Sequence, residues 1–220
     1  MGSGKQVDLE FNNSDTETAY GLGYRDPYFT EDGVSLGVGA HYRELDNSDE
    51  VTSYSYDSLA ANFDVGLPTS EYERLFIGFE PQRLSNVNCG SSGVTSLCTT
   101  LIAQEGGDSF DVMELTTSWS RDSRNRAIFP DQGGYQQFRA EMGAPGGVEY
   151  YMVGYRHDLF FPLTESYTLL LKGEVGMGDG YGDQSKLPFF SRYYAGGESS
   201  VRGFAGNSIG PQDVGTGKSV

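Results

Sequence analysis

Apolar and polar residues alternate along most of the chain, and this alternation returns about nine times. In residues 7–11, for example, Val7, Leu9 and Phe11 alternate with charged residues. A repeat of two residues is that of a β-strand, because successive side chains of a strand point to opposite faces of the sheet. The pattern predicts strands at residues 7–11, 34–42, 59–67, 75–79, 113–119, 138–144, 151–161 and 169–177, and it is ambiguous at residues 19–24.

This alternation fits two kinds of β-protein. A soluble sandwich packs two apolar faces together, whereas a membrane barrel turns its apolar face to lipid and keeps a polar lumen. A tilted strand needs about 10 residues to cross a bilayer, while strands of sandwiches average about 5 to 6 residues, and the segments here fit the longer length. No apolar run approaches the roughly 18 residues of a membrane-spanning helix. We therefore favour a membrane barrel, with a soluble up-and-down β-protein as the alternative.

The connections between these segments alternate in character. Short ones carry a proline and usually an aromatic residue at a strand end, and they lie at residues 26–33, 67–72, 129–133 and 161–167. Longer or more polar ones lie at residues 12–17, 46–57, 85–109 and 145–149 and after Met177. Outer-membrane barrels have short periplasmic turns and long extracellular loops, with aromatic residues at the membrane boundary. The asymmetry supports a barrel, and residues 99–104 are expected to form a short helix inside the longest loop.

Composition and charge narrow the possible functions. The 31 Gly, 15 Tyr and 13 Phe favour strands and turns over helices. A net charge of -16 offers no basic surface for phosphates, so nucleic acid is not an expected partner. Seven charged residues fall on the polar face of the strands, and we interpret them as a hydrated, paired inner wall without an isolated acid–base pair for hydrolysis. They are Glu114, Arg139, Glu141, Arg156, Asp158, Lys172 and Glu174.

Cys89 and Cys98 lie in a polar stretch rich in Gly and Ser. This context favours a surface disulfide in an oxidising compartment, with two free thiols as the alternative. We expect no metal, because neither His41 nor His157 has ligand spacing to the cysteines, and we expect no cofactor.

Two features near the ends of the chain have plain interpretations. The glycines at positions 176, 178, 180 and 182 superficially suggest a phosphate-binding loop. Because no Lys-Ser/Thr pair or helix follows them, a flexible loop is the preferred interpretation. The first four residues lack the basic start and apolar core of a signal peptide, so we expect a segment from within a longer protein.

Two passages resemble the BamA family of outer-membrane barrel insertases. Residues 24–37, which contain the turn Asp26-Pro27-Tyr28-Phe29, resemble an aromatic turn of that family and the strand that follows it. Residues 190–204 look like the family's most diagnostic segment, which ends in the Val-Arg-Gly-Phe motif of the sixth extracellular loop. The continuation at residues 207–211 is also similar. The resemblance covers almost the whole chain.

The resemblance implies an all-β fold, an antiparallel up-and-down transmembrane barrel in the bacterial outer membrane. Residues 1–178 would form about strands 3 to 11 of a barrel of 16 strands, and residues 179–220 the first half of extracellular loop 6. The implied function is a non-enzymatic one, that of the central component of the machinery that folds and inserts β-barrel proteins. The implied partners are outer-membrane lipid, unfolded β-barrel substrates and accessory lipoproteins, which bind through periplasmic domains outside this sequence.

The resemblance also implies a site at the motif formed by Val201, Arg202, Gly203 and Phe204. The loop tip would enter the lumen, where the five donors of the Arg202 guanidinium suit carboxylates of the inner wall. Gly203 would allow close backbone approach, Phe204 would anchor the loop and Val201 would only pack. The carboxylate partners would lie beyond Val220, and an exposed turn arginine is the alternative.

Two other classes of function remain open. One is a polypeptide secretion transporter of the two-partner secretion type, which belongs to the same superfamily and shares the loop motif. The other is a passive porin or adhesin in which the motif is a coincidence. The Asp-Pro-Tyr-Phe turn and the Tyr-Ala-Gly-Gly sequence at residues 194–197 favour the insertase.

Overall fold

The computed structural model describes residues 4–46, 54–89, 95–184, 186–193, 195–197, 200–204 and 209. Nine antiparallel strands form a sheet in which each strand pairs with its neighbours in sequence, from β1 to β9. The strands are β1 (Gln6–Asn13), β2 (Glu17–Asp26), β3 (Ser35–Asp46), β4 (Tyr54–Pro68), β5 (Glu73–Cys89), β6 (Phe110–Asp122), β7 (Gly133–Gly143), β8 (Tyr150–Pro162) and β9 (Thr168–Gly180). Helix α1 (Thr95–Glu105) lies between β5 and β6.

The predicted all-β, up-and-down architecture is confirmed. Each predicted strand overlaps one observed strand, and the ambiguous residues 19–24 lie within β2. The helix expected at residues 99–104 lies within α1, which is longer. The strand expected to end at residue 79 continues to Cys89, so the following connection starts later than predicted. This continuation was not predicted from the sequence, in which Pro81 argues against it because proline usually interrupts a strand. In the structure Pro81 nevertheless lies in register with Met113 of β6.

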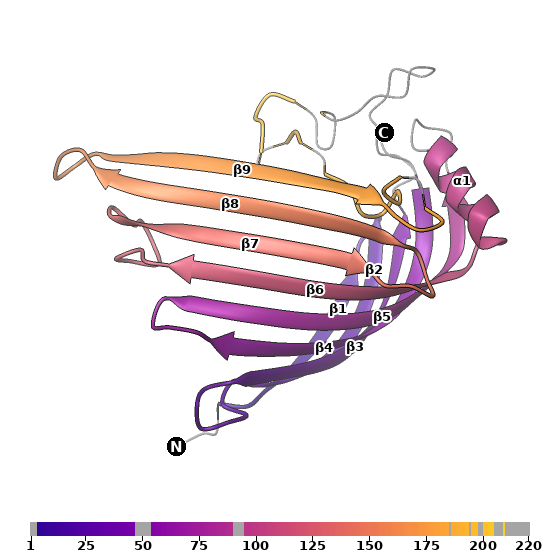
Figure 1. Ribbon diagram of the computed structural model, residues 1–220, viewed down its shortest axis with the longest axis horizontal. Coiled ribbons are helices and arrows are strands. Elements are labelled where there is room, and N and C mark those ends of the chain that lie inside the picture. Colours follow the sequence, from indigo (N-terminus) through magenta and orange to yellow (C-terminus); the bar gives the residue numbers. More distant parts are fainter. Residues whose placement is uncertain are drawn as a thin grey trace.

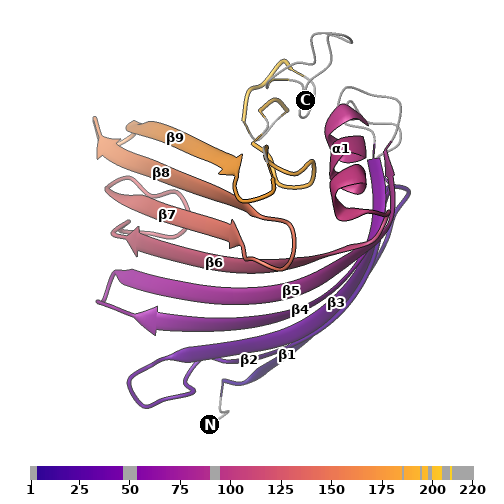
Figure 2. The ribbon, with the colours of Figure 1, turned by 45° about the vertical axis from the view of Figure 1, so that its right-hand side comes forward.

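The sheet curves like part of a barrel wall, with β1 and β9 at its two edges (Figures 1 and 2). The turns that follow β2, β4, β6 and β8 lie together at one end of the strands, the short-turn end. Helix α1 lies at the opposite end, the α1 end (Figure 1). Both α1 and the described residues that directly follow β9 lie on the concave side of the sheet (Figure 2). No helix among the described residues is long and apolar enough to cross a bilayer.

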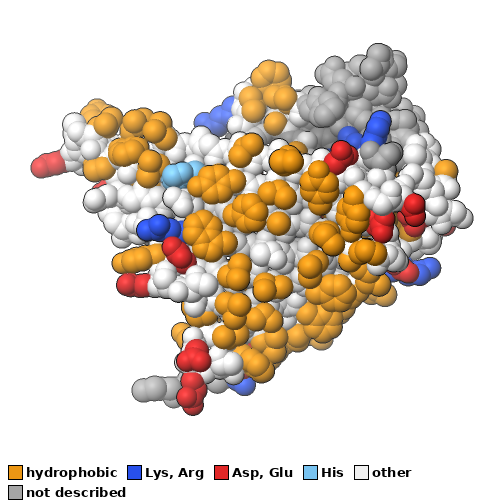
Figure 3. Space-filling view, viewed as in Figure 1, with side chains coloured by type: hydrophobic (Ala, Val, Ile, Leu, Met, Phe, Trp, Pro, Cys, Tyr) orange, Lys and Arg blue, Asp and Glu red, His pale blue; other side chains and the backbone are white. Residues whose placement is uncertain are grey.

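The convex face of the sheet is apolar. Figure 3 shows hydrophobic side chains spread over this face, whereas acidic and basic side chains gather toward the ends of the strands. In β1 the outward residues Val7, Leu9 and Phe11 are 66%, 81% and 72% exposed. Large exposed apolar areas of this kind are typical of a surface that meets another apolar phase, and in a barrel that phase is lipid.

The concave face changes character along the strands. Toward the middle it is polar, with Asn62, Asp64, Glu80 and Thr116 among the inward residues. Toward the α1 end it is apolar, and α1 and the chain after β9 cover it. The last strand ends at Gly180, two residues beyond the boundary predicted at residue 178. Of the predicted loop 179–220, the structure describes residues 179–184, 186–193, 195–197, 200–204 and 209.

Candidate functional site on the inner wall

A hydrophobic core fills the concave side at the α1 end. Its buried residues come from three strands, from α1, from the connection between β7 and β8 and from the chain after β9. Because these segments lie far apart in the sequence, the core joins them across the inner face. Its buried members are Leu84, Val87, Cys98, Leu101, Phe110, Val112, Val148, Tyr150 and Phe189.

A β-bulge explains how the end of β5 takes part in this core. The pairing of β4 with β5 shifts register between Ser55 and Asp57, and Asn86 has a φ of 53°. The Asn86 amide donates a hydrogen bond to the Asp57 carboxylate, which stabilises the bulge. An extra residue reverses the alternation of faces, so Val87 is buried although it stands three residues after the buried Leu84. Alternation along the sequence gave no signal for this change.

Cys89 and Cys98 form a disulfide in the structure, with their Cα atoms 5.7 Å apart. The bond joins the end of β5 to α1. Cys98 is fully buried in the core beside Leu101, so the expectation of a surface disulfide was wrong about its location. The helix places Cys98 there because it packs against the inner side of β5.

We predict that the two cysteines are oxidised in the mature protein. Peptide mapping by mass spectrometry without reduction should recover a peptide pair linked through Cys89 and Cys98, because burial of Cys98 shields the bond from reductants. The same protein after unfolding and reduction is the control, and it should give two separate peptides. Free thiols at both positions in native protein would contradict the prediction.

Two ion pairs join four of the seven charged residues predicted for the inner wall, Arg156 with Asp158 and Arg139 with Glu141. The Arg156 guanidinium donates to both oxygens of Asp158, at 2.5 to 3.2 Å. In the register of β8 with β9, Arg156 stands opposite Glu174 and Asp158 opposite Lys172, which places opposite charges side by side on one face. These contacts support the interpretation of a paired wall.

Tyr150 connects the charged part of the wall to the apolar core. Its ring is fully buried, and its hydroxyl lies 3.1 Å from Glu114 Oε2 and 2.9 Å from Glu141 Oε1. Arg139 forms an ion pair with Glu141 at 3.3 Å. The hydroxyl has one hydrogen to donate, so at any moment it serves one of the two carboxylates.

The glycines near the end of β9 do not form a flexible loop. Gly176, Gly178 and Gly180 belong to β9, and only Gly182 of the four lies beyond the strand, with a φ of 63°. The phosphate-loop alternative fails for the same reason, because strand residues do not wrap a phosphate.

Tyr181, in the connection that follows β9, donates a hydrogen bond from its hydroxyl to the carbonyl oxygen of Gly143 at 2.6 Å. Burial, together with the nearby Glu149, raises the pKa of Tyr181 above its usual range.

The Val-Arg-Gly-Phe motif forms a turn. The Phe204 N–H donates to the Val201 carbonyl at 3.4 Å, and the Gly197 N–H donates to the Phe204 carbonyl at 3.0 Å. Gly203 has a φ of 92°, a conformation that favours glycine. All four motif residues are exposed, and within the described part of the chain no carboxylate forms an ion pair with Arg202. Anchoring in the lumen therefore stays a prediction. Of residues 207–211, only Ile209 lies within the described chain.

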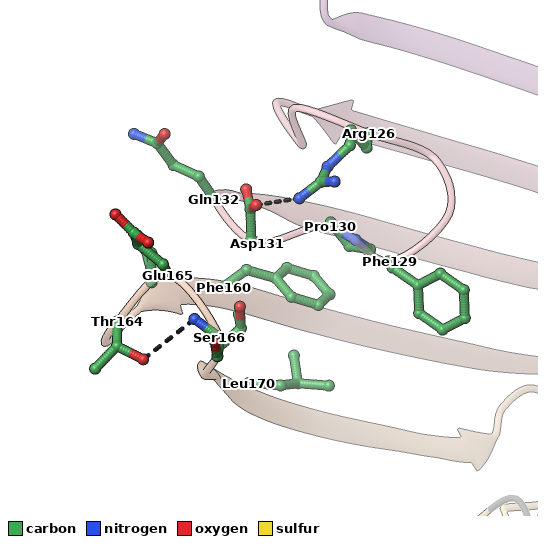
Figure 4. A pocket seen from close by; sticks show the side chains of 12 residues that line it. Arg126, Phe129, Pro130, Asp131, Gln132, Phe160, Thr164, Glu165, Ser166 and Leu170 are labelled. Atoms are coloured by element: carbon green, nitrogen blue, oxygen red, sulfur yellow. Dashed lines mark hydrogen bonds and ion pairs between the residues drawn. The ribbon is translucent and has the colours of Figure 1, made fainter.

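A cavity of about 750 Å³ lies at the short-turn end (Figure 4). It is bounded by the turn between β6 and β7, which carries an ion pair of Arg126 with Asp131, and by the turn between β8 and β9. Phe160 and Leu170, which face each other across β8 and β9, contribute apolar surface. The cavity is open, and two of its three charged residues, Arg126 and Asp131, are paired with each other, so we assign it no chemistry.

Fold and inner surface together define a wall segment of an outer-membrane β-barrel whose interior is partly filled by its own chain. The chain matches the Omp85 superfamily domain over residues 1–220, and it belongs to that superfamily. It is therefore a protein of the bacterial outer membrane.

Two relatives make the comparison more specific. The chain is 32% identical over 221 residues to the outer membrane protein assembly factor BamA of Neisseria meningitidis serogroup B, a match that covers 96% of this chain and 28% of that protein. The crystal structure of BamA from Haemophilus ducreyi lacking POTRA domains 1–3 superposes with a TM-score of 0.85 at 27% identity, and covers 95% of this chain and 42% of that one. The resemblance to the BamA family is thereby confirmed. The chain spans less than half the length of either relative.

Proposed function

We propose that this chain is the central wall of a non-enzymatic protein that folds and inserts β-barrel proteins into the bacterial outer membrane. The observation that carries the proposal is the likeness to BamA over almost the whole chain, in both sequence and fold. Residues 1–178 would correspond to about strands 3 to 11 of a barrel of 16 strands, and residues 179–220 to the first half of extracellular loop 6.

The proposal has a physical basis in the needs of an unfolded strand. In lipid, its backbone N–H and C=O groups must all be paired, and an exposed sheet edge provides a template for that pairing. In the proposed mechanism a substrate strand adds at the barrel seam, while the segment described here supplies the wall and the loop that returns to the lumen. The partners are then outer-membrane lipid and unfolded β-barrel proteins, with accessory lipoproteins held by periplasmic domains of the complete protein.

The alternative function is polypeptide secretion by a transporter of the two-partner type. Membership of the Omp85 superfamily is compatible with it. The two functions differ in outcome: an insertase leaves a folded barrel in the membrane, whereas a transporter releases its partner on the other side. Complete protein in liposomes, supplied with an unfolded test barrel, distinguishes them by whether the barrel becomes protease-resistant in the bilayer.

We predict that Arg202→Ala lowers both the stability and the assembly activity of the complete protein. A guanidinium held by carboxylates in the lumen contributes about 1.5 to 3 kcal/mol, and alanine removes it. Heat-modifiable migration on gels measures stability, and insertion of a test barrel into liposomes measures activity.

Arg202→Lys is the matched variant, because it keeps the charge but lacks the planar fork of donors. It should show a smaller loss than alanine in both measurements. If the alanine variant migrates and inserts barrels like the unaltered protein, the lumen-anchoring role of Arg202 is wrong.

A further inference from the structure

Residues 186–193, here called the return segment, lead from the end of β9 back across the inner face of the sheet. Pro188 is buried and Phe189 is fully buried. The Phe189 ring centroid lies 5.0 Å from that of Tyr54 and 6.3 Å from that of Tyr56, and both tyrosines belong to β4. The segment therefore connects β9 to β4, which lies five strands away in the sheet.

Phe190 extends this contact to the strands in between. Its ring centroid lies 5.3 Å from Phe189, 6.3 Å from Phe110 of β6 and 6.2 Å from Tyr150 of β8. Edge-to-face and offset arrangements of aromatic rings at these distances are attractive beyond the burial of area. The first half of the return segment is thus fixed to the core at the α1 end.

Tyr193 makes a second and separate contact, on a pair of glycines. Gly154 of β8 and Gly176 of β9 stand opposite each other in the sheet. A β-carbon at Gly176 would lie 2.6 Å from Cζ and 2.7 Å from Cε1 of Tyr193, and one at Gly154 would lie 3.3 Å from its hydroxyl oxygen. The ring occupies space that any larger residue at position 176 would fill, so the glycine is required by this contact.

Gly173, in the same strand, shows that this requirement is local. A β-carbon at Gly173 would meet no atom within 4 Å. The two glycines differ in face, because residues 173 and 176 are separated by an odd number of positions in a strand. Gly173 therefore provides a control for any effect of losing a glycine from β9.

The motif turn is tied closely to the second contact. Four residues after Tyr193, the Gly197 N–H bonds to the Phe204 carbonyl, and the Gly196 N–H bonds to the Ser200 hydroxyl at 2.7 Å. Only seven residues separate Tyr193 from Val201, and the described residues Gly196, Gly197 and Ser200 among them bond to each other or to the motif. The position of Tyr193 therefore restricts where the motif turn can lie.

We propose that Phe189 and Tyr193 are positioning residues that attach the return segment to the inner wall at two points and so set where the Val-Arg-Gly-Phe turn is presented. The attachment is inferred only from the contacts of Phe189 and Tyr193 with the wall. That the placement of the turn matters for barrel insertion rests on the proposed function.

Limited trypsin digestion of the complete protein in detergent tests the attachment, because the return segment contains Arg192 directly before Tyr193. Gly176→Val should increase cleavage after Arg192 roughly tenfold, since cleavage follows the population of locally opened chain. Tyr193→Ala should do the same, and Tyr193→Phe should restore protection, because the ring rather than the hydroxyl fills the space. Gly173→Val should leave cleavage unchanged. Mass spectrometry identifies the cleaved bond.

The double variant Gly176→Val with Tyr193→Ala should be cleaved no faster than either single variant, as expected for two residues that share one contact. Unchanged cleavage in Gly176→Val, or equal increases in Gly176→Val and Gly173→Val, would overturn the proposal. The proposal would also be overturned if cleavage rose at sites throughout the chain and heat-modifiable migration were lost. The contact of Tyr193 with Gly176 would then contribute only to general stability. Digestion requires no substrate, so a failure of the proposed function would appear separately, as unaltered protein that inserts no test barrel.

Discussion

Replacing Phe63 by arginine should destabilise the complete barrel by about 2 to 4 kcal/mol, the cost of a cation on the lipid face near the bilayer midplane. Phe63 lies near the middle of β4 on the convex face, where it is 51% exposed. Its partners in the sheet are Val38 and Phe79, also apolar. An arginine at this position would have only hydrocarbon and apolar side chains around its charge.

The neighbouring position provides the matched control. Asn62 points to the concave side, where its amide donates to Asp64 at 2.8 Å. Asn62→Arg should change stability by less than about 1 kcal/mol, because a cation there meets water and a carboxylate. Unfolding by urea in lipid vesicles, followed by gel migration, measures both variants. Equal losses at the two positions would mean that the convex face does not contact hydrocarbon.

Tyr150→Ala should lower the free energy of unfolding by about 3 to 5 kcal/mol, the usual effect of removing a buried aromatic ring from a core. The ring is fully buried and lies against Phe190, and the hydroxyl contacts Glu114 and Glu141. Alanine would open a cavity at the junction of β6, β7, β8 and the return segment.

Tyr150→Phe separates the ring from the hydroxyl. It keeps the packing but removes the donor that the two carboxylates share, so a loss of about 1 to 3 kcal/mol is expected. The temperature at which the folded form disappears from gels should fall in the order unaltered protein, phenylalanine variant, alanine variant. An alanine variant as stable as the unaltered protein would show that the core at the α1 end contributes nothing to the barrel.

The strands were predictable because one physical rule governs most of them. Side chains that alternate between lipid and lumen must alternate in polarity, so β1, β3, β4 and β9 are visible in the sequence as repeats of two. The inward position of the charged wall follows from the same rule, and its pairs Arg156–Asp158 and Arg139–Glu141 stand two residues apart on one face.

The rule fails where the lumen is not filled with water. At the α1 end the inner face is apolar, whereas outward positions of β5 such as Arg83 and Ser85 are polar. The polarity of the alternation is therefore inverted in the second half of β5, and the bulge at Asn86 then shifts it by one residue. Burial of Cys98 and of Phe189 depends on contacts between segments distant in sequence, which no local pattern reports. The sequence signal for a buried segment after β9 was the aromatic pair Phe189-Phe190, which directly follows Pro188 within a polar stretch.

The order of pairing in the sheet has a consequence for how the barrel matures. Each ladder joins strands adjacent in sequence, so every hairpin except that of β5 with β6 can form through a short loop closure, which is fast. The contact of Phe189 with Tyr54 is of the opposite kind, because it spans most of the chain and needs the intervening hairpins in place. The wall is thus expected to form first, with a vacant interior, and the return segment to settle into it as the final step of folding.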